Sequence, residues 1–149
     1  MGTSLYDSDF FTWTQEQAAL LRDGKVDALD LANLAEEIES LGKSDRRALG
    51  SHVRGLVMHL LKWHAQPSGR QTGQSWRTSI NNHRREIQAI ADDSPSLRQQ
   101  IVVLLAREYP RSRRDASDET GLPLVAFPET CPWTVEQILD EAFWPEVTP

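Results

Sequence analysis

The stretch SDRRALGSHVRGLVMHLLKWHAQPSGRQTGQSWRTSINNHRREIQAIADD, residues Ser44 to Asp93, decides the fold. Apolar residues recur at helical spacing in both of its halves, and the segment from Pro67 to Gln74 has the glycine, serine and polar content of a loop. A connection of about eight residues favours antiparallel, adjacent helices. The predicted stripes are Leu49, Val53, Leu56, Val57, Leu60 and His64, facing Trp76, Ile80, His83, Ile87, Ile90 and Ala91. We therefore predict a helical hairpin at the centre of the core.

Two short helices are expected before this hairpin. Thr12 or Thr14 can cap the first, and Gly24 suits the left-handed residue that ends a helix. The second starts near Asp27 or Asp30 and stops at Gly42. The residues expected to face inward are Trp13, Gln17, Leu20 and Leu21 in the first helix and Leu31, Leu34, Ala35, Ile38 and Leu41 in the second.

Helix signals continue after the hairpin. Ser94 and Pro95 start a helix that Pro110 must kink or end, because proline lacks an amide hydrogen. Residues 122–133 contain three prolines and predict an extended strap, after which Thr134 opens a last short helix. No segment alternates with period two. The fold class is therefore all-α: a compact bundle of about five to six helices with a Pro-rich C-terminal strap.

Length and composition predict a single helical domain over residues 1–149, because the 39% hydrophobic content is that of an ordinary globular protein. The longest apolar run, Ile101 to Ala106, is far shorter than the roughly 20 residues that cross a bilayer. The N-terminus lacks the pattern of a secretory signal, and the lone Cys131 cannot form an internal disulfide. We expect a cytoplasmic protein with no membrane association.

Charge is strongly segregated along the chain. Residues 1–45 hold ten acidic against three basic residues, net −7, and residues 46–114 hold thirteen basic against four acidic, net +9. The last 35 residues hold eight acidic and no basic residues. The basic middle could bind a nucleic-acid backbone through Arg46, Arg47, Arg54, Arg70, Arg77, Arg85 and Arg98. The alternative is that the acidic ends neutralise it within the fold, and this is the interpretation we favour.

A set of polar and aromatic residues is placed where the two hairpin helices face each other: His59, Lys62, Trp63, Trp76, His83 and Arg84. One interpretation is a buried network that fixes helix register, with His83 and Arg84 paired to Glu36, Glu37 or Glu39. The other is a small pocket for an anion or polar ligand, formed by these six residues and Glu37, in which His59 and Arg84 hold the charge and tryptophans form the walls.

The loop before Ser75 is a second candidate anion site. Free amides at a helix N-terminus favour anions, and Arg70 and Arg77 would reinforce them. The glycine spacing between Gly69 and Gly73 does not match a phosphate-binding P-loop. A bound anion here is therefore expected to be adventitious rather than a nucleotide.

The sequence gives little support for catalytic activity. No glutamate is followed three residues later by a histidine, which argues against a di-iron bundle. His83 and Glu86, with His59, are the remaining candidates for a metal-dependent hydrolase site, and we expect no metal there. Cys131 has no neighbouring histidine in sequence, so nucleophilic catalysis is not indicated. We expect no cofactor.

Several motifs resemble those of a known bacterial family. They are Tyr6, Asp9, Phe10, Trp13, Glu16 to Gln17 and Leu20 to Arg22, then Leu29 to Asp30, Asn33 to Leu34, Glu36 to Glu39 and Leu41 to Gly42, and further on His59 to Trp63, Ser75 to Trp76, Ile80, Arg84, Phe127 to Pro128, Cys131 to Pro132 and Thr134. In these positions the chain resembles the bacterial domain of unknown function 29 family. The resemblance implies a compact helical domain that forms almost the entire protein, and it implies no reaction.

The leading hypothesis is a non-enzymatic helical protein that binds a partner or a small ligand or anion. Nucleic-acid binding through the basic middle is the alternative from another class, and metal-dependent hydrolysis is a third. The tryptophans and the acidic strap also suggest a homodimer.

Overall fold

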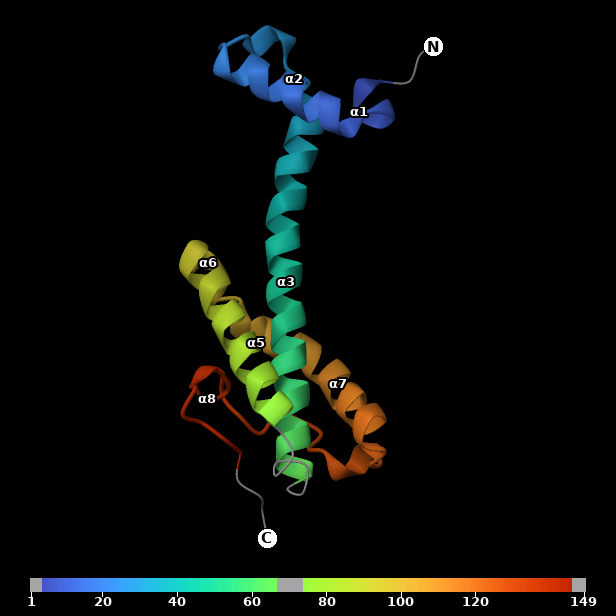
Figure 1. Ribbon diagram of the computed structural model, residues 1–149, viewed down its shortest axis with the longest axis vertical. Helices are drawn as coiled ribbons and strands as arrows, with labels where there is room; N and C mark the ends of the chain where they lie inside the picture. Colours follow the sequence, from blue (N-terminus) through green and yellow to red (C-terminus); the bar gives the residue numbers. More distant parts are fainter. Residues whose placement is uncertain (1–3, 67–73, 146–149) are drawn as a thin grey trace. The chain divides into compact units, whose positions relative to one another are not determined.

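The computed structural model describes residues 4–66 and 74–145 (Figure 1). Within these residues all regular structure is helical, which confirms the all-α class. The elements are α1 (Leu5–Ser8), α2 (Phe10–Arg22), η1 (Val26–Ala28), α3 (Leu31–Ala65), α5 (Gln74–Asp93), α6 (Pro95–Arg98), α7 (Ile101–Thr120), η2 (Leu124–Ala126) and α8 (Val135–Leu139). Four of these, α2, α3, α5 and α7, are longer than one or two turns.

Packing divides the chain into two compact units, Met1–Ser44 and Asp45–Pro149. We call them the N-terminal unit and the C-terminal unit. Each has its own internal packing, and the boundary between them falls within α3. The single domain over residues 1–149 stays a prediction.

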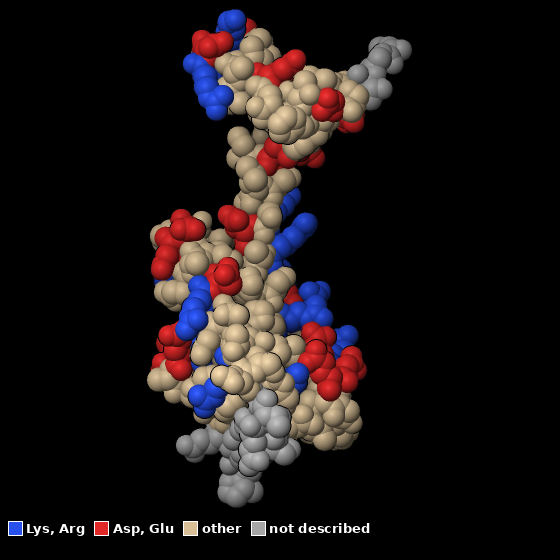
Figure 2. Space-filling view, in the orientation of Figure 1, with Lys and Arg blue, Asp and Glu red and all other residues tan. Residues whose placement is uncertain are grey.

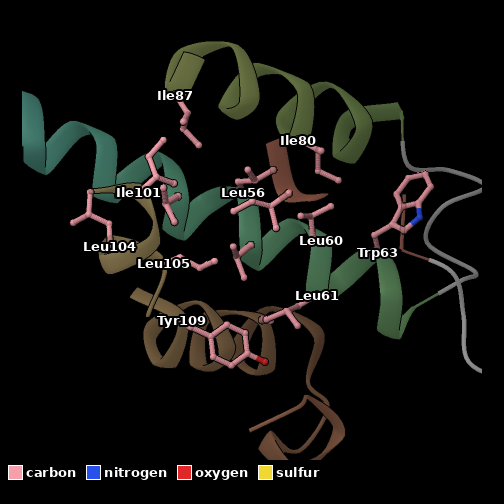
Figure 3. Packing of buried hydrophobic residues seen from close by; sticks show 14 of the residues in the cluster. Leu56, Leu60, Leu61, Trp63, Ile80, Ile87, Ile101, Leu104, Leu105 and Tyr109 are labelled. Atoms are coloured by element: carbon pink, nitrogen blue, oxygen red, sulfur yellow. The ribbon is translucent and has the colours of Figure 1, made fainter. Parts of the chain in front are cut away.

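The core of the C-terminal unit lies between α3, α5 and α7 (Figure 3). The inward residues of α3 recur three and four positions apart, and Leu56 and Leu60 on α3 meet Ile80 and Ile87 on α5. All four side chains are fully buried, so each contributes roughly 1.5–3 kcal/mol of transfer free energy. The predicted helical hairpin is therefore confirmed.

The segment after α7 is the Pro-rich strap that the sequence predicts. Gly121 ends α7 with a φ of 73°, a left-handed conformation that favours glycine. The strap contains only the short turn η2 and buries Phe127 against the core. Tyr109 on α7 donates a hydrogen bond to the carbonyl of Pro128, and Thr134 forms a capping box with Gln137 at the start of α8. These contacts fix the strap onto the bundle.

Gly42, expected to end a helix, and Pro110, expected to kink or end one, both lie within continuous helices. Gly42 lies within α3, so the predicted stop there is wrong. A glycine inside a helix costs only about 1 kcal/mol, which the packing of neighbouring turns can offset. Pro110 lies within α7, which continues to Thr120. The proline removes the hydrogen bond that its amide would donate to the carbonyl of Ala106, and the helix does not end there.

The start of α2 also differs from the prediction. Neither Thr12 nor Thr14 is the cap; Asp9 is, and its carboxylate accepts a hydrogen bond from the Thr12 amide at 3.1 Å. The Thr12 hydroxyl donates to the same carboxylate at 2.8 Å, and this bond together with that of the amide holds the pKa of Asp9 below its usual value. Aspartate is favoured at the N-cap of a helix as much as threonine is, so Asp9 was an equally good candidate for the first residue of this cap.

The N-terminal unit is a hairpin of α2 and the first turns of α3, closed by polar contacts at Asp30. The Asp30 carboxylate accepts hydrogen bonds from the Trp13 indole at 3.1 Å and the Asn33 amide at 2.8 Å. Its backbone amide donates to the Gln17 side chain at 2.8 Å. Trp13 and Gln17 are buried, while Gly24, with a φ of 70°, turns the chain after α2.

Candidate functional site

Six predicted site residues lie on the two facing helices of the C-terminal unit: His59, Lys62 and Trp63 on α3 and Trp76, His83 and Arg84 on α5. The structure brings several of them together. The Lys62 ammonium lies 4.8 Å from the centroid of the Trp76 ring, and the rings of His59 and His83 are 6.0 Å apart. This polar cluster is therefore a real feature of the hairpin.

Three histidines form a row within the polar cluster. The Nδ1 atoms of His52 and His83 are 3.0 Å apart, so one ring nitrogen donates to the other. The His83 ring occupies a notch that Gly55 leaves on α3: a Cβ at this position would lie 2.6 Å from the His83 Nε2 atom. The helices approach closely here because Gly55 has no side chain. His52 is a member of the row that the sequence did not single out.

Substituting Gly55 with alanine should lower the free energy of unfolding by about 1–3 kcal/mol, since the rigid imidazole of His83 must move. Gly42 is the matched control in α3, because a Cβ there meets nothing within 4 Å. Gly42→Ala should raise the stability by about 0.5–1 kcal/mol through helix propensity alone. Urea unfolding of both variants measures the difference. If both substitutions raised the stability equally, the close packing of His83 against Gly55 would be contradicted.

Burial disfavours the charged form of two histidines of the polar cluster, His59 and His83. Burial, with smaller contributions from Lys62 and His83, lowers the pKa of His59 to about 4. Burial and the neighbouring His52 lower the pKa of His83 as well. The Nδ1 atom of His59 is buried and has no hydrogen-bond partner. The lowered pKa argues against the expectation that His59 holds a charge for an anionic ligand, which stays a prediction.

Arg84 binds main-chain carbonyls of the C-terminal segment. Its Nε donates to the carbonyl of Ile138 and its Nη2 to the carbonyl of Phe143, both at 2.8 Å. The guanidinium also lies 5.3 Å from the centroid of the Trp144 ring, and the residue is only 2% exposed. Ile138 is in the last turn of α8, where carbonyls lack helical partners. Arg84 therefore connects α8 and the residues that follow it to α5.

Arg84 donates to main-chain carbonyls in and after α8, whereas the acidic partners proposed for it lie in the N-terminal unit. Glu37, the predicted seventh member of the pocket, lies in the N-terminal unit and accepts a hydrogen bond from the Tyr6 hydroxyl. That bond raises the pKa of Tyr6 to about 12. Main-chain carbonyls 54 and 59 residues further along the chain give no sequence signal, so these partners could not be predicted.

The remaining members of the polar cluster also have partners. Lys62 forms an ion pair with Glu119 of α7, at 2.7 Å. The Trp63 ring packs on Trp144, with centroids 4.7 Å apart, and the guanidinium of Arg77 lies over both rings. Arg70, the other candidate anion ligand, lies outside the described residues. The predicted pocket residues are thus largely engaged by one another and by the C-terminal segment.

The basic middle segment is largely neutralised inside the C-terminal unit. Arg54 forms a bidentate ion pair with Asp115, with N–O distances of 2.6 and 2.9 Å. Arg98 forms an ion pair with Asp92. Arg85 pairs with Glu141 and Arg46 donates to Gln100. Residues 45–149 hold thirteen basic and thirteen acidic residues, so their net charge is zero.

The described part of the chain shows neither a cluster of metal ligands nor an activated thiol. Within residues 4–66 and 74–145, no three His, Cys, Asp or Glu side chains are placed to share a metal ion. The Cys131 thiol donates to the carbonyl of Trp133, and burial raises its pKa, which lowers its thiolate content. In the same residues no helix is long and apolar enough to cross a membrane.

A groove runs along the hairpin of the N-terminal unit and has a volume of about 430 Å³. One wall is the face of α2 with Phe10, Trp13, Thr14, Gln17, Ala18 and Leu21. The other wall is the face of α3 with Leu34, Glu37, Ile38 and Leu41. Both walls follow helical spacing, so each is one continuous stripe of its helix. We call this feature the hairpin groove.

The hairpin groove is lined by large apolar side chains that remain in contact with solvent. Phe10 is 48% exposed, Leu21 55%, Ile38 67% and Leu41 69%. Single exposed apolar residues are ordinary, but a contiguous row of them marks an interaction surface. Tyr6, Phe10 and Trp13 form a packed aromatic cluster at one end of the row, with ring centroids 4.8 to 5.8 Å apart.

The sequence misassigned this surface. Leu31, Ile38 and Leu41 were expected to face inward with Leu34, yet the first three are more than 60% exposed. Helical periodicity shows that one face of a helix is apolar, and it does not show whether this chain supplies the residues that cover the face. The excess of acidic residues in residues 1–45 was the available signal that the region is a surface.

The fold and its two features define an all-α protein with an engaged polar cluster and an uncovered apolar groove. The family model described as domain of unknown function DUF29 matches residues 5–144, and the chain therefore belongs to this family. This confirms the resemblance found in the sequence. No curated protein and no solved structure matches the chain.

Proposed function

We propose that this protein is a non-enzymatic interaction module whose hairpin groove receives an amphipathic helix of a partner protein. The row of exposed apolar side chains along the hairpin groove is the observation that carries the proposal. A hairpin of two helices needs a further element to cover such a face, and a third helix is the simplest cover.

The dimensions support a helical occupant. The 13 residues of α2 span about 20 Å, and the wall residues Phe10, Gln17 and Leu21 follow one another along most of this length. A docked helix of three or more turns places residues i, i+3, i+4 and i+7 along the same distance. Helix-in-groove docking therefore matches the groove better than an extended peptide, which needs a sheet edge.

The polar cluster supports no competing function. Burial lowers the pKa of His59 and His83, and Arg84 and Lys62 are bound to main-chain carbonyls and to Glu119. No observation favours the nucleic-acid alternative, because the C-terminal unit has no net charge. We keep the cytoplasm as the proposed compartment.

The test is a titration of the full chain with a labelled amphipathic peptide of about 18 residues that has a leucine face and a neutral polar face. We expect saturable binding, followed by fluorescence anisotropy, and weaker binding by at least about fivefold in Ile38→Gln. Phe11→Gln is the matched control, because Phe11 is 73% exposed on α2 but does not line the groove. Both sites are exposed, so neither substitution should affect folding.

Two results would overturn the proposal. One is the absence of binding by any leucine-faced helix up to about 1 mM peptide. The other is an equal loss of affinity in the Ile38 and Phe11 variants, which would show that binding does not use the groove.

A further inference from the structure

We infer that the occupant of the hairpin groove is a basic amphipathic helix, with apolar anchors on one face and Lys or Arg residues along its edges. This inference rests on the proposed function and specifies the partner. The observation that carries it is the net negative charge of the N-terminal unit, together with Glu37, the charged residue in the groove wall.

The N-terminal unit is acidic. Residues 1–44 hold nine acidic and three basic residues, a net charge of −6. In Figure 2 red acidic side chains are spread over the hairpin, whereas blue side chains gather near the end of α2. The acidic charge is thus a property of this unit, since the C-terminal unit is neutral overall.

The acidic residues include one in the wall of the hairpin groove, and the basic residues lie elsewhere. Glu37 is in the α3 wall, beside Ile38, and Asp30 closes the hairpin at the start of the same helix. No Lys or Arg is among the residues that line the groove. Lys43 follows Leu34 by nine residues, which at roughly 100° per residue places it on the opposite side of α3.

A groove of this kind selects its partner by sign. Apolar burial supplies the affinity of a docked helix, while charges around the contact set the approach rate and reject like-charged partners. A basic helix satisfies both conditions. Nucleic acids and anionic lipid surfaces carry the same sign as the hairpin and are repelled from it.

A second copy of this chain is a poorer occupant. Symmetric pairing of two hairpins would bring two units of charge −6 together and would face each Glu37 toward the same acidic surface. The homodimer expected from the sequence is therefore not the partner that we infer for this groove.

The experiment compares three peptides that share one leucine face and differ only on the polar face, which carries Lys, Glu or Gln. Each is titrated into the full chain at about 20 mM and about 200 mM salt. We expect the Lys peptide to bind at least about tenfold more tightly than the Gln peptide at low salt, and the Glu peptide to bind more weakly than both. The advantage of the Lys peptide should shrink at high salt, because exposed charges are screened.

A protein variant locates the effect in the groove. Glu37→Gln removes one wall charge and keeps an oxygen that can accept the Tyr6 hydrogen bond, so the hairpin should still fold. It should reduce the preference for Lys over Gln peptide by about threefold or more. Glu39→Gln is the matched control, since Glu39 does not line the groove and its loss should change the preference less.

The outcomes separate this inference from the proposed function. Equal binding of the three peptides at both salt concentrations overturns the basic partner and leaves helix docking intact. Preference for the Glu peptide, or an equal effect of both glutamate variants, also overturns it. Binding by none of the peptides overturns the proposed function itself, and dimerisation of the chain on sedimentation that blocks peptide binding identifies a second copy as the occupant.

Discussion

Replacing Arg84 with alanine is expected to lower the free energy of unfolding by roughly 3 kcal/mol. The substitution leaves the buried carbonyl of Ile138 and the partly buried carbonyl of Phe143 without their Arg84 donors, and hydrogen bonds to a charged group are worth about 1.5–3 kcal/mol each. For a chain of this length the midpoint of thermal unfolding should fall by about 6–12 °C. Thermal unfolding followed by circular dichroism measures this shift.

Arg85 provides the control for this prediction. It is the next residue on α5, its side chain is 67% exposed, and its ion pair with Glu141 is open to solvent. Arg85→Ala should therefore cost no more than about 0.5 kcal/mol. If the two alanine variants unfold at the same temperature, Arg84 is not the connection between α8 and α5 that its hydrogen bonds indicate.

Acid should destabilise the protein through His59. The pKa of this histidine is about 4 in the folded chain against an ordinary value of 6.5, so the unfolded state takes up a proton first as the pH falls. The stabilisation is therefore complete above pH 6.5 and is lost progressively toward pH 4. Between about pH 7.5 and about pH 5 this single group should remove roughly 2 kcal/mol.

His59→Leu isolates the effect. Leucine fills a similar volume and cannot be protonated, so the variant should lose about 2 kcal/mol less than the wild type over the same pH interval. His83 is present in both proteins, so the contribution of its own lowered pKa largely cancels in the difference. Urea unfolding at the two pH values measures it. Parallel loss of stability in both proteins would show that His59 is protonated equally in the folded and unfolded states.

The fold could be predicted where local signals determine it. The stripes around Leu56 and Ile80, the left-handed Gly24 and the capping box at Thr134 each depend on residues within a few positions, and each is observed. The stop at Gly42 was wrong because a glycine only weakens a helix and does not end it.

The site was less predictable for a different reason. Arg84 was correctly placed at the edge of the core, but its partners are main-chain carbonyls, which every residue carries and no sequence pattern marks. The hairpin groove was missed because Ile38 and Leu41 follow the same periodicity as core residues. Whether an apolar stripe is covered depends on tertiary contacts, so the exposed fractions were needed to recognise it.

The small interior of the hairpin has a consequence for how it responds to a partner. Among its described residues only Trp13 and Gln17 are fully enclosed, and one of these is polar. Segments with so little buried apolar area open locally at low free-energy cost, so the amide hydrogens of α2 should exchange with solvent sooner than those around Leu56. A docked helix would complete this interior, and binding would thus be recorded as slower exchange in residues that never touch the ligand.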